Sequence, residues 1–326
     1  MQQTSAPSLR EKGNSANSFF DKNSQEMAIE GLKQMACCVP VSIVIPAFNE
    51  GAIIGDTLDL LCREPSLATA EIIVVDDGST DNTAAIVAGF PQVRMTRHAS
   101  NRGYGSALVT AMKMATRDYI VWMDADGQHQ VKDVIKVIDL LAGQALDYCI
   151  GVRDNSSYQD PERLAGKWVL RYVVNLAAGR SVSDFNSGLR GFRRDVIRKY
   201  WHLFPKGFGA STTTTLIMLE RNYLGGHVPI HVRSRTGKSS VKQVRDGLRT
   251  LTLILRIFLL FKPLHFFGAI GLATTMAGFG YGLWSALAEG QGFPVLGAVV
   301  LLSGTQTMFL GLIMDQISGM RRERFE

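Results

Sequence analysis

The sequence has few cysteines and no apolar run near its amino terminus. Its four cysteines lack the spacing of metal ligands, and they suggest neither a disulfide framework nor a redox pair. We therefore expect reduced, mostly buried thiols of a cytoplasmic domain at Cys37, Cys38, Cys62 and Cys149. Residues 1–36 are rich in Ser, Asn, Gln and Lys, which predicts a mostly disordered tail without an export signal.

The net charge is positive, but by itself it identifies no partner. The formal charge of +6 suits nucleic acid, anionic lipid or phosphorylated substrates equally well. The mean hydropathy of +0.07 is high for a fully soluble protein, and the apolar residues are unevenly distributed. The basic residues adjoin the most apolar segments and lack interleaved aromatics for stacking on bases, which argues against a nucleic-acid partner.

From Val39 onward, short β-forming runs alternate with helical patterns. Strands are expected at residues 41–45, 71–75, 93–95, 119–123 and 148–150, with helices between them. Short connections between alternating strands and helices predict an α/β fold with a doubly wound, mainly parallel sheet. After about residue 150 the alternation loosens, with helical patterns at 164–178 and 211–223 and an edge strand at 227–232.

Two carboxylates end the fourth predicted strand. Asp124 and Asp126 follow an apolar run and are separated by one residue, with Gln128 two residues further on. In an open α/β sheet, ligands bind at the carboxyl ends of the strands. Two carboxylates and an amide carbonyl form an all-oxygen set that suits Mg²⁺ or Mn²⁺ shared with substrate phosphates. The alternative is a solvated turn at the end of a strand.

A glycine pair superficially resembles a dinucleotide-binding loop. Gly103 and Gly105 are followed by Leu108 at the third glycine position, and the pattern comes after the third predicted strand rather than the first. Both departures argue against an NAD-dependent enzyme.

Two long segments near the carboxyl end contain no Asp, Glu, Lys or Arg. Residues 263–288 and 293–314 are each long enough to cross a hydrocarbon core of about 30 Å at about 1.5 Å per residue. The joint around Glu289 is short, so we expect a hairpin with both ends on one side of a membrane. Cations flank the hairpin and are absent from its turn, which predicts a cytoplasmic α/β domain and cytoplasmic termini.

The segment before the hairpin and the glycines within it also indicate association with a membrane. Residues 248–261 carry only two arginines among apolar residues, which favours an interfacial helix over a buried core helix. Gly297, Gly304 and Gly311 recur every seven residues on the second span. Such small residues permit close helix packing, either within the hairpin or in a homo-oligomer formed through these helices.

The motifs together resemble the family 2 glycosyltransferases of GT-A fold. The resemblance rests on VSIVIPAFNE (41–50), VVDDGSTDNT (74–83), Asn101-x-Gly103-x-Gly105 and DADGQH (124–129), in that order, and it covers about residues 39–240. Asp184 with Ser187-Gly-Leu-Arg190, and Arg235-x-Gly237-x-Ser239, are similar to the polyprenyl-phosphate (dolichyl-phosphate) hexosyltransferase branch. The two apolar spans match members that carry a membrane hairpin.

This resemblance implies a set of site residues. Asp124, Asp126 and Gln128 would hold Mg²⁺ or Mn²⁺, and Asp126, Asp184 and Arg190 are the catalytic candidates. The nucleotide sugar would be bound by Pro46, Ala47, Phe48, Glu50, Asp76, Asp77, Gly105, Asp124, Ala125 and Asp126. For Asp76 and Asp77 the alternative is a turn with a helix cap.

The acceptor determines how much base catalysis is needed. A lipid monophosphate has a second pKa near 6 and already presents an ionised oxygen at neutral pH. Cations would therefore position the nucleophile, and guanidinium groups match phosphate geometry. The candidates for the acceptor phosphate are Arg190, Arg233, Arg235, Lys238 and Ser239. Asp184 would act as a base or would orient Arg190. For the basic residues between 233 and 245, the alternative is a face that contacts solvent or lipid headgroups.

Two positions depart from the family pattern. Ser240 stands where a lysine usually follows the acceptor-side serine, and Gly127 stands where leucine is usual, which is expected to loosen the loop after the metal site. No Gln-x-x-Arg-Trp motif is present, which argues against a processive polysaccharide synthase.

The predicted function is inverting transfer of a hexose from a UDP- or GDP-linked sugar to polyprenyl phosphate at the cytoplasmic membrane face. The alternatives are another lipid or polysaccharide acceptor, and a non-catalytic nucleotide-sensing scaffold. The predicted organisation is a tail (1–36), a GT-A domain (37–240), an interfacial helical segment (241–262), a hairpin (263–317) and a basic cytoplasmic tail (318–326).

Overall fold

The computed structural model describes residues 39–154, 171–172, 174–175, 182, 184–207, 209–232, 252, 263–288, 290 and 292–323. The predicted tail (1–36), almost all of the predicted interfacial segment (241–262) and four acceptor-phosphate candidates, Arg233, Arg235, Lys238 and Ser239, lie outside these residues.

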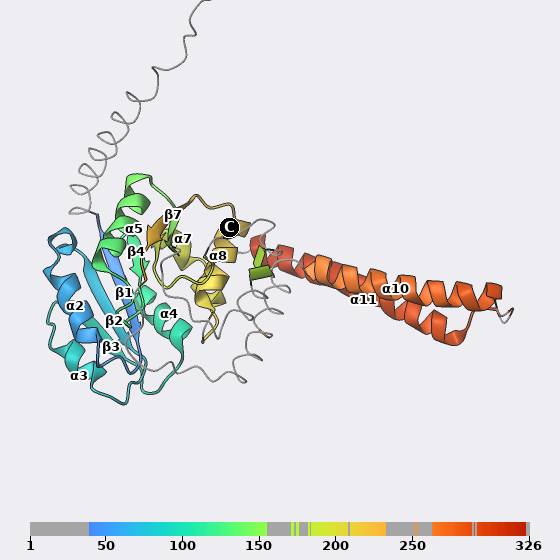
Figure 1. Cartoon of the computed structure of the whole chain (residues 1–326), viewed down its shortest axis with the longest axis horizontal. Helices are drawn as coiled ribbons and strands as arrows, with labels where there is room; N and C mark the ends of the chain where they lie inside the picture. Colours follow the sequence, from blue (N-terminus) through green and yellow to red (C-terminus); the bar gives the residue numbers. More distant parts are fainter. Residues whose placement is uncertain are drawn as a thin grey trace, which may run out of the picture.

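An α/β domain precedes a long helical hairpin in the chain (Figure 1). Two 3₁₀ turns, Pro65–Leu67 and Trp201–Leu203, supplement its regular elements. The elements are β1 (Val41–Ala47), α2 (Ile54–Arg63), β2 (Glu71–Asp76), α3 (Thr83–Ala88), β3 (Val93–Arg97), α4 (Tyr104–Met114), β4 (Tyr119–Trp122), α5 (Val131–Gly143), β5 (Tyr148–Arg153), β6 (Arg190–Arg193), α7 (Arg194–Arg198), α8 (Ala210–Glu220), β7 (Gly225–Ile230), α10 (Pro263–Ala288) and α11 (Val295–Glu323).

The strands form one seven-stranded sheet in the order β3-β2-β1-β4-β6-β5-β7. The pairs β1–β2, β1–β4, β2–β3 and β5–β7 are parallel, whereas β6 runs antiparallel to both of its neighbours. The predicted mainly parallel sheet is therefore confirmed, with one reversed strand inside it. The predicted edge strand is also confirmed, because β7 ends the sheet.

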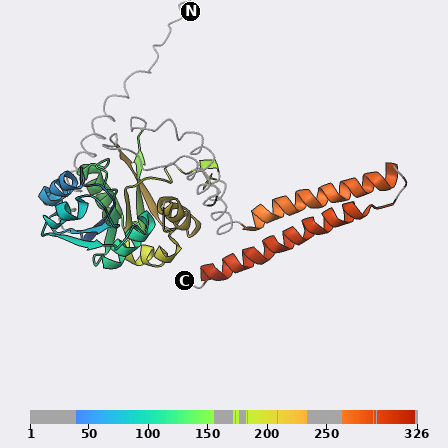
Figure 2. The same cartoon turned by 90° about the horizontal axis from the view of Figure 1, so that it is seen from below.

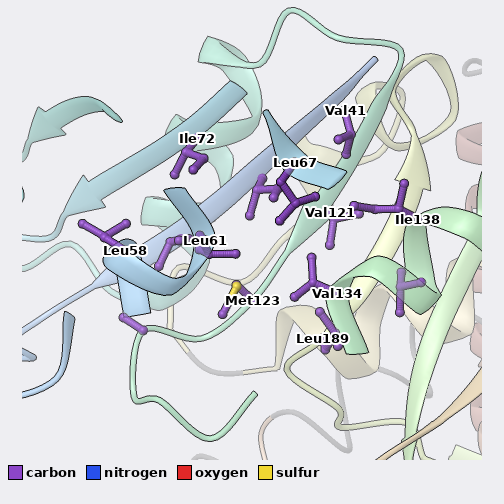
Figure 3. Close-up of a cluster of buried hydrophobic side chains, with 14 of the residues drawn as sticks. Val41, Leu58, Leu61, Leu67, Ile72, Val121, Met123, Val134, Ile138 and Leu189 are labelled. Atoms are coloured by element: carbon purple, nitrogen blue, oxygen red, sulfur yellow. The ribbon is translucent and has the colours of Figure 1, made fainter. Parts of the chain in front are cut away.

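Apolar side chains cover both faces of the sheet. Along β1, Val41, Ile43 and Ile45 belong to the cluster beneath α2 and α5, whereas Val44 belongs to the opposite cluster beneath α4 and α8. Figure 3 shows part of the first cluster. Because a sheet buried on both faces needs apolar residues at successive positions, its strands appear in the sequence as continuous apolar runs.

The strand order places a crevice beside β1. The chain goes from β1 outward through β2 to β3, then returns to β4 on the other side of β1. Helical connections therefore leave in opposite directions above the carboxyl ends of β1 and β4, which is where open α/β sheets bind ligands. The antiparallel β6 begins at this same edge, since Arg190 pairs in register with Trp122 at the end of β4.

The helices α10 and α11 lie side by side and extend away from the domain in two views (Figures 1 and 2). Both are long and apolar enough to cross a membrane. The second helix continues to Glu323, so the part of the predicted tail from residue 318 to residue 323 is helical.

Glycines bring the two helices of the hairpin together. A methyl group on Gly304 would lie 2.4 Å from the backbone nitrogen of Thr275, and one on Gly278 would lie 2.5 Å from that of Leu301. These small residues are thus used within the hairpin, and they give no support to the homo-oligomer hypothesis.

Replacing Gly304 with valine is expected to push the two helices apart, because backbone atoms occupy the space that the side chain needs. We expect a destabilisation of about 1–3 kcal/mol, measured as a lower thermal midpoint in detergent micelles. Gly280→Val is the matched control, since a Cβ at Gly280 meets no atom within 4 Å. Equal midpoints for the two variants would contradict the packing described here.

Candidate active site

The aspartates after β4 are held in a tight turn. Ala125, between the two aspartates, is 3% exposed and belongs to the cluster beneath α2 and α5. The Oδ1 atom of Asp126 accepts a hydrogen bond from the backbone N–H of Gln128 at 3.2 Å. Gly127 has φ +70°, a left-handed conformation that glycine adopts without strain. The glycine that was expected to loosen this loop therefore fits its turn.

Asp124 is enclosed by two other segments. The Tyr104 hydroxyl donates a hydrogen bond to Oδ1 of Asp124 at 2.7 Å. Burial and the neighbouring carboxylate of Asp124 raise the pKa of Tyr104 well above its ordinary value, so the phenol stays protonated and remains the donor. On the other side, a methyl group on Gly188 would lie 2.0 Å from Oδ2 of Asp124 and 3.1 Å from Nε2 of His129. The loop before β6 therefore closes against the carboxylates.

Asp77 has a different environment from the one expected. Its carboxylate is 2% exposed, and it accepts hydrogen bonds from the backbone N–H groups of Arg102 at 2.9 Å and Gly103 at 2.7 Å. His98 Nδ1 lies 2.6 Å from its Oδ1 atom. These contacts occupy both oxygens, so Asp77 fixes the loop that begins α4. The expected contact of Asp77 with the nucleoside stays a prediction.

Asp76 is fully buried and faces the next turn. Its Oδ1 atom accepts from the backbone N–H of Ser79 at 2.8 Å, and its Oδ2 atom lies 2.9 Å from Nε of Arg97.

The loop after β1 is tied to the loop after β2. The backbone N–H of Asn49 donates to Ser79 Oγ at 2.9 Å, and Thr80 N–H donates to Asn49 Oδ1 at 2.8 Å. Pro46 and Ala47 are buried in β1, whereas Phe48 is 39% exposed and Glu50 is half-buried. Among these nucleotide-binding candidates, the structure leaves the Phe48 ring accessible at the strand end.

Gly105 also differs from the expectation. A Cβ there would lie 1.9 Å from the backbone oxygen of Pro205, and its N–H donates to the carbonyl of Gly207 at 3.2 Å. The glycine therefore permits a close approach of two backbone segments, and it is occupied by protein rather than facing the crevice.

Arg153 is a candidate that the sequence analysis missed. It ends β5, and its guanidinium forms a two-point pair with Asp184: Nε to Oδ2 at 2.8 Å and Nη2 to Oδ1 at 3.0 Å. Burial would raise the pKa of Asp184, but the hydrogen bonds and charge of Arg153 hold it below its ordinary value. The charge of Asp124 also raises the pKa of Arg153 after its contacts with Asp184. A carboxylate with such a low pKa is a poor general base near neutral pH.

Arg190 is a buried structural residue in this fold. Its side chain is 0% exposed. Its guanidinium donates to the carbonyl oxygens of Ser187 at 2.9 Å and Phe185 at 2.8 Å, and to the Thr215 hydroxyl at 2.6 Å. These contacts use the guanidinium donors away from solvent, and the expected contact of Arg190 with an acceptor phosphate stays a prediction. Asp184 orients Arg153 and does not hydrogen-bond to Arg190.

The donor set fits a divalent ion that shares its coordination with a substrate. Among the described residues, no group of three or more His, Cys, Asp or Glu side chains gathers to hold an ion. Asp124, Asp126 and Gln128 supply only oxygen, which suits Mg²⁺ or Mn²⁺. Few protein ligands leave positions for phosphate oxygens, as nucleotide sites with Mg²⁺ require.

Comparisons with known proteins match both parts of the chain. The profile described as glycosyl transferase family 2 matches residues 42–201, and the profile described as the GtrB C-terminal hairpin matches residues 262–320. A UDP-N-acetylglucosamine–dolichyl-phosphate N-acetylglucosaminyltransferase of Methanococcus voltae is 28% identical over 214 residues, which cover 58% of this chain and 84% of that protein.

Two further comparisons extend this result. An undecaprenyl-phosphate 4-deoxy-4-formamido-L-arabinose transferase of Yersinia pestis is 26% identical over 293 residues, which cover 85% of this chain and 88% of that protein. The crystal structure of glucosyl-3-phosphoglycerate synthase from Mycobacterium tuberculosis with Mn²⁺, UDP and phosphoglyceric acid has a TM-score of 0.57 and 20% identity. It covers 71% of this chain and 81% of its own, a likeness that concerns the fold.

Proposed function

Since the chain belongs to glycosyltransferase family 2, we propose that it transfers a hexose from a nucleotide-diphosphate sugar to the phosphate of a polyprenyl phosphate. One observation carries the proposal: Arg153 with its partner Asp184 lies at the same sheet edge as Asp124 and Asp126. A cation for an acceptor phosphate thus lies beside carboxylates suited to a metal-bound diphosphate. Two relatives are named for transfer to dolichyl or undecaprenyl phosphate, which supports this acceptor class.

Asp124, Asp126 and Gln128 would hold Mg²⁺ or Mn²⁺ on the donor diphosphate. The ion supplies positive charge that stabilises the leaving nucleoside diphosphate. The Phe48 ring, which is exposed in the β1 loop, would contact the nucleotide, and Glu50 lies half-buried in the same loop.

The acceptor supplies its own nucleophile. An ionised oxygen of the lipid phosphate attacks the anomeric carbon, the new carbon–oxygen bond forms as the bond to the diphosphate breaks, and the nucleoside diphosphate leaves. No proton has to be removed, because a phosphate monoester is largely dianionic at neutral pH. Direct displacement inverts the configuration at that carbon. Arg153 would orient the acceptor phosphate, and Asp184 would hold the guanidinium in place.

The membrane gives this acceptor its location. The hairpin formed by α10 and α11 would anchor the domain to the bilayer, with the catalytic domain and both termini in the cytoplasm. Arg233, Arg235, Lys238 and Ser239 precede the hairpin in the chain and remain candidates for the acceptor phosphate.

A screen of UDP- and GDP-linked hexoses with a short polyprenyl phosphate tests the proposal. Labelled sugar should appear in the lipid fraction only with Mg²⁺ or Mn²⁺ present. A non-catalytic nucleotide sensor would bind a nucleotide and give no lipid-linked product with any donor.

Replacing Arg153 with alanine is expected to raise the KM for polyprenyl phosphate by roughly 10–100-fold, because one charge-assisted hydrogen bond contributes about 1.5–3 kcal/mol. The KM for the nucleotide sugar should change much less. Arg193→Ala is the matched control, since Arg193 also pairs with an aspartate, Asp147. Arg193 is the last residue of β6, and Arg190 at the other end of that strand is the one near the candidate site. A rise in the KM for the donor alone would contradict the assignment.

A further inference from the structure

Tyr104 joins two elements at the candidate metal site. It is the first residue of α4, and its hydroxyl donates to Oδ1 of Asp124, which follows β4, at 2.7 Å. Its ring is partly buried and packs against the core cluster that contains Trp122 and Phe204. The hydroxyl therefore reaches the carboxylate from a fixed ring position.

The start of α4 is itself anchored to the end of β2. Gly103 has φ +95°, and its N–H donates to Oδ2 of Asp77 at 2.7 Å. His98 contacts Asp77 through Nδ1 at 2.6 Å and the Thr110 hydroxyl of α4 through Nε2 at 3.0 Å. Asp77 thus holds the helix at its start and, through His98, about two turns later. These two contacts determine where the Tyr104 hydroxyl lies.

We propose that Tyr104 is a positioning residue for Asp124, and that it connects the β2 side of the crevice to the metal-binding side. The proposal rests on the proposed function, which makes Asp124 a metal ligand. A hydrogen bond to one oxygen restricts the rotation of a carboxylate group. The lone pairs that remain for the metal ion then keep one direction. Removing such a partner of a metal ligand typically lowers metal affinity by about 10–100-fold.

Binding of Mn²⁺ to the full-length protein in detergent micelles tests this role. Free Mn²⁺ is measured by electron paramagnetic resonance in the presence of UDP and, separately, GDP. We expect the Kd for Mn²⁺ to rise about 10–100-fold in Tyr104→Phe. Tyr200→Phe is the matched control, because it also loses a buried hydroxyl contact, to Tyr223 at 3.1 Å, but away from the carboxylates. Its Kd should stay at the wild-type value, and both variants should keep similar thermal midpoints.

The outcomes separate this inference from the function on which it rests. If Tyr104→Phe binds Mn²⁺ as tightly as the wild type, the positioning role is wrong and the proposed metal site stands. If Tyr104→Phe loses binding together with a large fall in its thermal midpoint, Tyr104 supports the fold, and the positioning role is again wrong. Absence of Mn²⁺ binding by the wild type with either nucleotide would overturn both proposals.

Discussion

Replacing Asp126 with alanine is expected to lower sugar transfer by at least about 10²–10³-fold while leaving the domain folded. The proposed reaction needs a held divalent ion on the departing diphosphate, and loss of one such electrostatic stabiliser has an effect of this size. In the turn, this carboxylate accepts a hydrogen bond from the Gln128 N–H, and loss of one such bond costs about 1 kcal/mol. Activity is measured as lipid-linked product, and folding as the thermal midpoint.

The control residue flanks the same strand as Asp126. Asp118 is an exposed aspartate just before β4, at the end of the strand opposite Asp126. Asp118→Ala should keep wild-type turnover. Wild-type turnover in a folded Asp126→Ala variant would remove Asp126 from the mechanism.

Replacing Arg190 with alanine is expected to destabilise the domain by roughly 3–5 kcal/mol. The substitution leaves a cavity and removes the donors from the carbonyls of Phe185 and Ser187 and from the Thr215 hydroxyl, all buried. For a domain of this size, such a change lowers the thermal midpoint by roughly 6–20 °C.

This result separates the two roles considered for Arg190. A residue that only binds the acceptor would give a variant of normal stability with a raised KM for the lipid phosphate. Arg63→Ala is the control, because the Arg63 side chain is 78% exposed and its pair with Asp59 lies on the surface. Exposed pairs contribute about 0–1 kcal/mol, so this variant should unfold close to the wild type.

The parts of the fold that could be predicted are those in which local pattern and burial agree. The run of β1 is apolar because both faces of the sheet are covered, and the strand before Asp124 shows the same signal. The apolar helices of the hairpin could also be predicted, because a 26-residue segment without Asp, Glu, Lys or Arg is typical of a membrane span. These features depend on neighbouring residues, which the sequence shows directly.

Arg153 could not be found in this way. Its partner Asp184 is 31 residues away, and the two meet because the antiparallel β6 lies between β4 and β5. No periodicity in the sequence encodes that order of strands. The contact of Arg190 with the Thr215 hydroxyl has a similar origin, since Thr215 lies 25 residues further along the chain, in α8. The four successive threonines at 212–215, all buried, were a polar signal within a helix that pointed to a buried polar partner.

The carboxylates at the strand ends show a second limit of prediction from sequence. Asp77 and Asp124 both follow apolar strands and look alike in sequence. The structure separates them, because Asp77 accepts from backbone N–H groups, whereas Asp124 accepts from the Tyr104 hydroxyl and faces the loop containing Gly188. A strand-end acid identifies the edge of the sheet where a site forms, and its hydrogen-bond partners determine its role.

The most direct test of the central claim is the bond that the purified protein makes. Lipid-linked product formed from an α-configured nucleotide hexose should be isolated and analysed by phosphorus–proton correlated NMR. We predict a phosphodiester that joins the sugar C1 to the polyprenyl phosphate, with β configuration. Free sugar as the sole product, or a sugar attached to another acceptor atom, would contradict the account.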